Sequence, residues 1–329
     1  MYAGTATASV AAAALLGAGT LLMPGTTAEA PGTDATAAGR PVEVAHTAAA
    51  GSATHAGAGV RAVSDVSRGW TDDPLVIAHR GASAYAPENT LAAVDKADVL
   101  GFDWVENDVQ LTRDGVPVVI HDTGLRRTTD AEEVFPGRAP WAVKDFTAAE
   151  IARLDAGSWF GPEYAGARVP TLRQYLHRIG RNHQNLLLEI KSPETYPGIE
   201  QATLRVLRQE GWLDREHVRS RLVIQSFGAD SLREVHEQRP DVVTGFLGTP
   251  ALADLPSYAE FTDRINPAYT SISSEYVAAV HALKGPHDKR LRLNTWTVND
   301  AEQALRVAGY GVDGIITNAP DVVREATTA

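Results

Sequence analysis

The sequence predicts a (β/α)8 barrel, and three observations support this prediction. From about Pro74 onward, short runs rich in β-branched residues alternate with segments of helix-like spacing, which is typical of a parallel sheet covered by helices. The expected folded domain, residues 71–329, is close to the roughly 250 residues that one such barrel needs. An open doubly wound sheet fits less well, because the glycines after Ile77 do not form the G-x-G-x-x-G turn of that fold.

Two segments of unusual composition precede this domain. Residues 1–30 contain a single charge, an apolar stretch from Val10 to Met23 and the small-residue end Ala28-Glu29-Ala30, which together indicate a secretory signal peptide. No Lys or Arg precedes the apolar stretch, so a disordered low-complexity terminus is the alternative. Residues 31–70 are rich in Ala, Thr, Gly and Pro and predict a flexible linker. We expect a secreted, extracellular protein of bacterial origin.

Nine segments are predicted as strands from their β-branched and aromatic content. In chain order they are Leu75–His79, Trp104–Gln110, Val116–His121, Asn185–Lys191, Arg221–Phe227, Val242–Leu247, Ala268–Ile272, Leu291–Val298 and Gly314–Asn318. The spacing of apolar residues predicts helices between most of them. These helices are Glu88–Leu100, Ala148–Leu154, Leu172–Ile179, Ile199–Glu210, Ser231–Glu237, Glu275–Ala282, Asp300–Val307 and Pro320–Glu325.

The third predicted strand does not belong to the ring. Only Leu111–Gly115 separates it from the second strand, and this link contains Asp114-Gly115, a pair typical of hairpin turns. A parallel crossover needs a dozen residues or more, so Val116–His121 must return antiparallel. The other eight strands suit a closed barrel.

Charge and cysteine content exclude several functional classes. The chain has 30 Lys and Arg against 41 Asp and Glu, and no Lys/Arg run offers the basic face that nucleic acid requires. The formal net charge of −11 also disfavours adhesion to anionic membranes. Because the chain has no cysteine, disulfides, thiolate catalysis, thiolate-bound zinc and a lipid-anchored precursor are excluded. A small molecule is the expected partner, without nucleic acid or stable membrane insertion.

Three carboxylates are expected to meet at the carboxyl ends of the strands, where barrel active sites lie. Glu106 and Asp108 are two apart on one strand and so point to the same face, while Val105 and Val109 would pack against helices. Glu189 lies in a similar apolar strand. Inward carboxylates repel one another, so a cation should lie between them. A site with oxygen ligands and no thiolate suits Ca²⁺ or Mg²⁺.

Two histidines and two cations are expected beside these carboxylates. His79 and His121 each follow an apolar strand, and two imidazoles that face one acidic site suit a general acid and a general base. Structural hydrogen-bonding residues and zinc ligands are the alternative interpretations. Arg80 and Lys191 suit the binding of a phosphate oxygen, with salt bridges to neighbouring carboxylates as their structural alternative.

An ordered series of short motifs extends over about residues 75–325. These motifs are His79-Arg80-Gly81, Pro87-Glu88-Asn89-Thr90, Glu106-x-Asp108-Val109, Thr112-x-Asp114-Gly115, His121-Asp122, Arg126-Arg127-Thr128-Thr129, Pro170-Thr171-Leu172, Glu189-Ile190-Lys191, Gln225-Ser226-Phe227, Asn294-Thr295-Trp296-Thr297-Val298-Asn299 and Asp313-Gly314-Ile315-Ile316-Thr317-Asn318. The series resembles the glycerophosphodiester phosphodiesterase family of the phospholipase C-like phosphodiesterase superfamily. The resemblance independently implies a (β/α)8 fold.

The resemblance implies three groups of site residues. The ligands of one divalent cation, Ca²⁺ or Mg²⁺, would be Glu106, Asp108 and Glu189. The acid–base pair would be His79 and His121. The substrate contacts would be Arg80, Lys191, Glu88, Trp296 and Phe227.

The implied reaction is the metal-dependent hydrolysis of glycerophosphodiesters to glycerol 3-phosphate and an alcohol such as choline or ethanolamine. One histidine would remove a proton from water or from the neighbouring glycerol hydroxyl, and the other would protonate the leaving alcohol. We favour His79 as the base and His121 as the acid. The resemblance also implies a small variable insertion after the hairpin strand, at about residues 123–169. We expect it to shape the pocket for the leaving alcohol with four aromatic residues, Trp141, Trp159, Phe160 and Tyr164.

Two alternative functions remain at this point. A phospholipase D-like or phospholipase C-like enzyme on the same barrel would act on lysophospholipids and would need an apolar mouth. A secreted binding protein would keep the fold without catalysis. The presence of both histidines and all three carboxylates argues against this second alternative.

Overall fold

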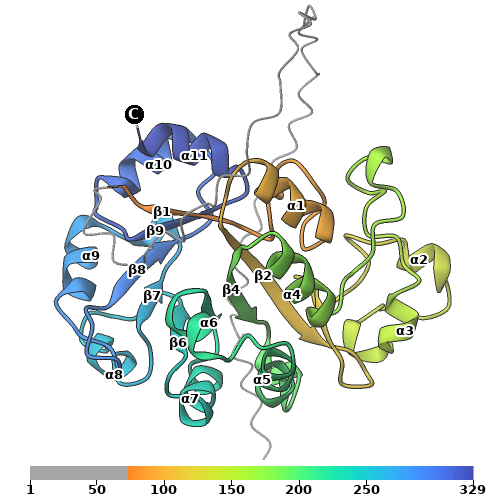
Figure 1. Ribbon diagram of the computed structural model, residues 1–329, viewed down its shortest axis with the longest axis horizontal. Coiled ribbons are helices and arrows are strands. Elements are labelled where there is room, and N and C mark those ends of the chain that lie inside the picture. Colours follow the sequence, from red (N-terminus) through yellow and green to blue (C-terminus); the bar gives the residue numbers. More distant parts are fainter. Residues whose placement is uncertain (1–72, 329) are drawn as a thin grey trace, which may run out of the picture. The chain divides into compact units, whose positions relative to one another are not determined.

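Residues 73–328 are described by the computed structural model, and their strands close into a ring (Figure 1). The predicted signal peptide, residues 1–30, and the predicted linker, residues 31–70, lie outside the described residues. Within the described part of the chain, no helix has the length and apolar character that crossing a membrane requires. The strands are β1 (Leu75–Ala78), β2 (Trp104–Leu111), β3 (Pro117–Val119), β4 (Asn185–Ile190), β5 (Leu222–Ser226), β6 (Val243–Leu247), β7 (Arg264–Asn266), β8 (Arg292–Thr295) and β9 (Gly314–Thr317).

Eight of these strands run parallel and form a closed barrel. Their order is β1-β2-β4-β5-β6-β7-β8-β9, with β1 paired to both β9 and β2. β3 lies outside the ring and pairs antiparallel with β2, with Val119 opposite Val109. Gly115 in the connecting turn has a φ of 73°, a left-handed conformation that favours glycine. The predicted (β/α)8 barrel with an extra antiparallel strand is therefore confirmed.

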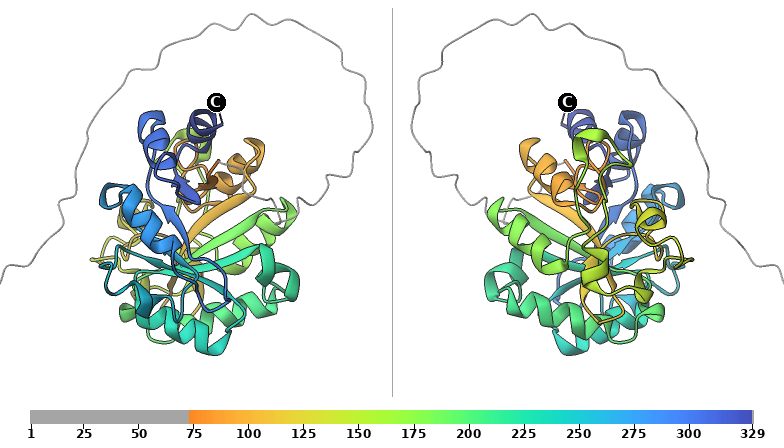
Figure 2. Two further views of the ribbon diagram at one scale, coloured as in Figure 1. Left: turned by 90° about the vertical axis from the view of Figure 1, so that its left-hand side faces the viewer. Right: turned by 90° about the vertical axis from the view of Figure 1, so that its right-hand side faces the viewer.

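Helices lie outside the ring of strands, as the side views show (Figure 2). Their bounds are α1 (Leu91–Val99), α2 (Ala131–Val134), α3 (Ala148–Ile151), α4 (Leu172–Arg181), α5 (Ile199–Gln209), α6 (Arg215–Ser220), α7 (Ala229–Gln238), α8 (Leu255–Tyr258), α9 (Ser274–His281), α10 (Ala301–Ala308) and α11 (Pro320–Thr327). Thr90 and Thr171 accept hydrogen bonds from the first turns of α1 and α4, which fixes where these helices begin. The sequence did not predict the short helices α2, α6 and α8, whereas α3, also short, lies within the predicted segment Ala148–Leu154.

The two faces of the barrel strands meet different surroundings. An apolar cluster inside the barrel is formed by Ile77, Leu187, Val223 and Ile316. Val105 and Val109, on the opposite face of β2, pack in the larger outer cluster that includes side chains of α4. Because side chains alternate along a strand, the two acidic residues of β2 face the interior with Leu187.

The predicted position of the seventh barrel strand is wrong. The strand is Arg264–Asn266, whereas the predicted segment Ala268–Ile272 contains a 3-10 turn and keeps only a single bridge from Ala268 to Trp296. Arg264 and Asn266 are buried polar residues, so the true strand lacks the apolar run on which the prediction relied.

The residues between β3 and α4 form a small unit with an apolar cluster of its own, which includes Leu125 and Phe146. Rings of Trp159, Phe160 and Tyr164 stack edge to face, with centroids 5.6 and 5.5 Å apart. The Tyr164 hydroxyl donates a hydrogen bond to the carbonyl of Tyr85 (2.6 Å), in the loop between β1 and α1. The insertion therefore contacts the loop that follows the carboxyl end of β1.

Candidate active site

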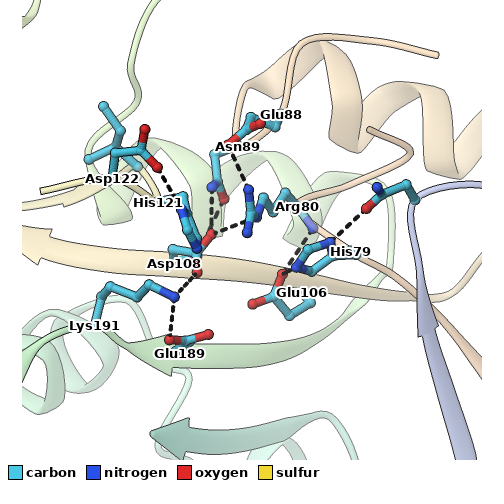
Figure 3. A network of polar contacts seen from close by, with 12 residues as sticks. His79, Arg80, Glu88, Asn89, Glu106, Asp108, His121, Asp122, Glu189 and Lys191 are labelled. Carbon is cyan, nitrogen blue, oxygen red and sulfur yellow. Dashed lines mark hydrogen bonds and ion pairs between the residues drawn. The ribbon is translucent and has the colours of Figure 1, made fainter. Parts of the chain in front are cut away.

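Three buried carboxylates meet inside the barrel near the carboxyl ends of β2 and β4 (Figure 3). We call Glu106, Asp108 and Glu189 the carboxylate cluster, because one oxygen of each lies within 4.8 Å of the others. All three residues are at least 95% buried, with exposures of 1%, 0% and 5%. Asp108 and Glu189 are register partners on neighbouring parallel strands, so the strand pairing itself brings them together.

The loop after β1 places a positively charged side chain, that of Arg80, against this cluster. Arg80 has a φ of 56°, and in this conformation its backbone N–H donates to Glu106 Oε2 (2.9 Å) while its Nε lies 3.2 Å from Asp108 Oδ2. Gly81 follows with a φ of 79°, and a Cβ there would lie 2.6 Å from the backbone carbon of Ala93. The His-Arg-Gly order therefore allows a tight turn that directs one arginine at two carboxylates.

Asn89 and Lys191 complete the polar contacts of the cluster. The Asn89 amide donates to Asp108 Oδ2 (2.7 Å), and its oxygen accepts from the backbone N–H of Asp108 (3.3 Å). Lys191 Nζ lies 2.8 Å from Glu189 Oε1 and 3.5 Å from Asp108 Oδ1. Sequence reasoning gave Asn89 no role, although its place in the Pro-Glu-Asn-Thr motif was a signal.

Burial and mutual repulsion shift the pKa values of the cluster. Burial, followed by the charges of Asp108 and Glu189, raises the pKa of Glu106 well above its ordinary value. Burial and Asp108 raise the pKa of Glu189 to about 8. Burial also opposes ionisation of Asp108, but Arg80 and Lys191 outweigh it and hold the pKa of Asp108 below its usual range. The positive charges of Arg80 and Lys191 therefore do not neutralise all three carboxylates.

The donor set of the cluster fits a divalent cation. Asp108 Oδ1 and Glu189 Oε1 are buried and lie near the Lys191 ammonium, yet neither accepts a hydrogen bond of normal geometry. Buried oxygens without such a partner are uncommon in folded proteins. Hard cations such as Ca²⁺ and Mg²⁺ prefer carboxylate oxygens, which are the three ligands offered here.

His79 directs a lone pair toward this cluster. Its Nε2 lies 4.0 Å from Glu106 Oε2, and its Nδ1 lies 2.6 Å from the amide oxygen of Asn318. An amide oxygen only accepts hydrogen bonds, so Nδ1 carries the proton and Nε2 keeps its lone pair. Burial and the charge of Arg80 lower the pKa of His79 to about 3, which leaves the imidazole neutral at neutral pH.

The Nδ1 atom of His121 is held by a network of charged side chains. Its Nδ1 lies 2.7 Å from Asp122 Oδ1, and the same carboxylate accepts hydrogen bonds from Arg127 (2.6 and 3.0 Å). Arg127 also binds both oxygens of Glu88 (2.8 and 2.7 Å), which accepts from Arg80 (2.9 Å). Glu88 therefore lies outside the carboxylate cluster and holds two arginines. Sequence reasoning assigned no role to Asp122 and Arg127, although both belong to the quoted motifs.

Gln110 is another residue that sequence reasoning missed. It occupies the next position after Asp108 on the same face of β2, and its Nε2 lies 3.0, 2.7 and 2.6 Å from the carbonyl oxygens of Ile120, His121 and Asp122. Its Oε1 accepts a hydrogen bond from the Tyr196 hydroxyl. Gln110 therefore fixes the backbone that carries His121.

Phe227 and Trp296 form an aromatic wall beside Lys191. Their rings meet edge to face with centroids 5.6 Å apart, and Lys191 Nζ lies 5.5 Å from the centroid of Phe227. The Trp296 indole is fixed by a hydrogen bond to the Asn266 carbonyl (2.8 Å), while Phe227 is 50% exposed. The structure thus places two of the predicted substrate contacts next to a third.

The protein is a closed (β/α)8 barrel, and its acidic, basic and imidazole groups gather at the carboxyl ends of the strands. This arrangement is typical of enzymes with the barrel fold. Residues 79–322 match the model of the glycerophosphoryl diester phosphodiesterase family. The chain belongs to this family and is an enzyme of it, as the resemblance of its motifs predicted.

Individual relatives agree with this assignment. A glycerophosphodiester phosphodiesterase of Bacillus subtilis (strain 168) is 35% identical over 283 residues, which cover 80% of this chain and 90% of the relative. One from Caldanaerobacter subterraneus subsp. tengcongensis is 38% identical over 257 residues, covering 76% and 96%. A solved phosphodiesterase from Oleispira antarctica, in complex with the product sn-glycerol-3-phosphate, is similar with a TM-score of 0.67 at 29% identity, covering 78% of this chain and 98% of that one.

Proposed function

We propose that the protein hydrolyses glycerophosphodiesters to glycerol 3-phosphate and an alcohol with the help of one divalent cation, Ca²⁺ or Mg²⁺. The observation that carries this proposal is the convergence of the carboxylate cluster with Arg80, Lys191 and two imidazoles at one end of the barrel. The product complex of the Oleispira antarctica phosphodiesterase supports a small phosphate-containing ligand.

Glu106, Asp108 and Glu189 would hold the cation. When bound, a divalent cation offsets negative charge on phosphoryl oxygens and so supplies Lewis-acid chemistry. Arg80 and Lys191 reach the same place with their own charges and would bind non-bridging phosphate oxygens, which gain charge in the transition state. The side chains of Arg80 and Lys191 are mostly buried, so they are held in position before the substrate arrives.

The two histidines would move the protons. His79 is neutral and presents its Nε2 lone pair, which suits removal of a proton from the nucleophile, either water or the neighbouring glycerol hydroxyl. As the new P–O bond forms and the bond to the alcohol breaks, His121 would give a proton to the departing oxygen. Asp122 orients His121 through Nδ1, so its Nε2 is the nitrogen left for this transfer.

The substrate class is tested by comparing glycerophosphocholine with lysophosphatidylcholine, each with added cation and with EDTA. The proposal predicts cation-dependent release of choline from glycerophosphocholine, together with glycerol 3-phosphate. Preference for lysophosphatidylcholine would instead support the phospholipase-like alternative. Absence of turnover on both substrates, with the protein folded and supplied with cation, would support a binding protein.

Replacing Gln110 with leucine is expected to lower kcat by about 10²-fold with little change in KM, because misplacing a proton donor by about 1 Å has effects of this size. The leucine cannot donate to the carbonyls of Ile120, His121 and Asp122. Tyr196→Phe is the matched control, since it removes only the hydrogen bond to Gln110 Oε1 and should have a smaller effect. A rise in KM at unchanged kcat would contradict this positioning role.

The stability of the cation-free protein is expected to fall as the pH rises from 4.5 to about 8. The pKa of Glu189 is raised from 4.5 to about 8, so between these values the folded state binds more protons than the unfolded state. The free energy of unfolding therefore decreases with pH in this window. An added divalent cation should offset the repulsion and raise Tm more at the upper end of the window. Thermal unfolding with EDTA or with cation measures this, and a cation effect that does not grow with pH would contradict the prediction.

A further inference from the structure

A buried arginine lies at the end of the barrel opposite the carboxylate cluster. Arg264 is the first residue of β7, and it faces the interior with Asn266, whose amide reaches across β6 to Gln225 Oε1 (2.9 Å). Its side chain is 8% exposed. The register partner on β6 is Gly245, where an added Cβ would lie 2.9 Å from Asn266 Nδ2 and 3.4 Å from the Cβ of Arg264. The absence of a side chain at Gly245 thus leaves room mainly for Asn266, next to the arginine on the same face.

No carboxylate of the described residues pairs directly with this guanidinium. Among residues 73–328, none forms a hydrogen bond or an ion pair with it, and its Nε is fully buried without a partner. The two nearby acidic residues are already engaged. Asp263 binds His287 (2.8 Å) and the backbone N–H of Thr244 (3.2 Å).

The second acidic neighbour, Asp313, is engaged more fully still. It accepts hydrogen bonds from Arg290 (2.5 Å) and from the backbone N–H of Leu293 (2.7 Å), and one of its oxygens lies 2.8 Å from His281 Nε2. Neither carboxylate forms an ion pair with Arg264 in the described part of the chain.

A second arginine lies beside Arg264. Arg292, the first residue of β8, is the register partner of Arg264 and is exposed. Burial and the charge of Arg292 lower the pKa of Arg264 to about 10, although Asp313 and Asp263 oppose the shift. A desolvated guanidinium next to another cation is a costly arrangement unless an anion compensates it.

We propose that Arg264 and Arg292 bind a small tetrahedral oxyanion, such as inorganic phosphate or sulfate, at the amino-terminal end of the barrel. The planar guanidinium offers parallel N–H donors that match the oxygens of such an anion. The Arg264 guanidinium has no hydrogen-bond partner among residues 73–328, and Arg292 beside it is exposed. This site is separate from the carboxylate cluster and does not depend on the proposed reaction.

Phosphate binding to the full chain tests the proposal, with EDTA present and sodium chloride at equal ionic strength as the reference. Thermal unfolding should show that phosphate raises Tm of the wild type, because a ligand that binds only the folded state stabilises it. In Arg264→Met the apparent dissociation constant from this titration should weaken about tenfold or more, the effect of losing one charge-assisted contact. Arg264→Lys keeps the positive charge but lacks the parallel N–H donors of the guanidinium. Its apparent dissociation constant should be intermediate.

Matched variants separate this site from phosphate bound at the carboxylate cluster. Arg205→Met removes an exposed arginine of α5 and should leave the phosphate response unchanged. Equilibrium dialysis with labelled phosphate should give one site fewer per chain in Arg264→Met than in Arg205→Met. Equal responses and equal stoichiometry in the two variants would overturn the proposal. If Arg264→Met does not fold, Arg292→Met, at an exposed position, must show the weaker phosphate response for the proposal to stand.

Discussion

Replacing His121 with alanine is expected to lower kcat for glycerophosphocholine by about 10²–10⁴-fold, the range for loss of a general acid or base. The reason is that choline is a poor leaving group and its oxygen needs a proton as the P–O bond breaks. Asp122, Arg127 and Gln110 all fix the position of His121, which indicates that this side chain must be placed accurately. His177→Ala, at an exposed position on α4, is the control and should keep full activity.

The identity of the leaving group distinguishes the two histidines. A glycerophosphodiester of p-nitrophenol has a leaving group that departs without protonation, so His121→Ala should recover most of its lost activity on this substrate. His79→Ala should not recover, because the nucleophile still has to lose its proton. Recovery of His79→Ala alone would reverse the two assignments. Near-normal turnover of glycerophosphocholine by either folded variant would contradict the acid–base pair.

Most of the barrel was predictable because its elements are local patterns. Strands with continuous β-branched runs, such as Asn185–Ile190, stand out from the sequence, and the five-residue link before Val116 could only be a hairpin. β7 escaped detection because its buried residues Arg264 and Asn266 are polar. Their burial depends on the closure of the ring, which the local sequence does not reveal.

The site was predictable where strand geometry determines it. The two-residue spacing of Glu106 and Asp108 placed both carboxylates on one face, and the barrel topology brought Glu189 beside them. The hydrogen bonds of Gln110 and Arg127 join residues that only the folded loops bring together, so no spacing in the sequence announces them. For Arg127, its place in the Arg126-Arg127-Thr128-Thr129 motif was the available signal, whereas Gln110 lies in none of the motifs.

Replacing Glu189 with glutamine is expected to change activity and stability in opposite directions. The raised pKa of Glu189 means that its charge is disfavoured in the cation-free protein, so a neutral amide of the same shape should raise Tm in EDTA at about pH 8. The same change removes one proposed ligand and should lower kcat by at least about 10²-fold, the effect of losing one preorganised electrostatic stabiliser.

Removing the cation with a chelator tests whether Glu189 acts through the proposed cation. EDTA should abolish turnover of the wild type, and added Ca²⁺ or Mg²⁺ should restore it, while Glu189→Gln should require a higher cation concentration and gain less Tm from it. Glu302→Gln, at an exposed position on α10, removes a carboxylate far from these ligands in the chain and should behave as the wild type. A residue that merely supports the fold would lose stability together with activity. A Glu189→Gln protein that is less stable in EDTA and keeps the wild-type response to cation would therefore contradict a cation held by the carboxylate cluster.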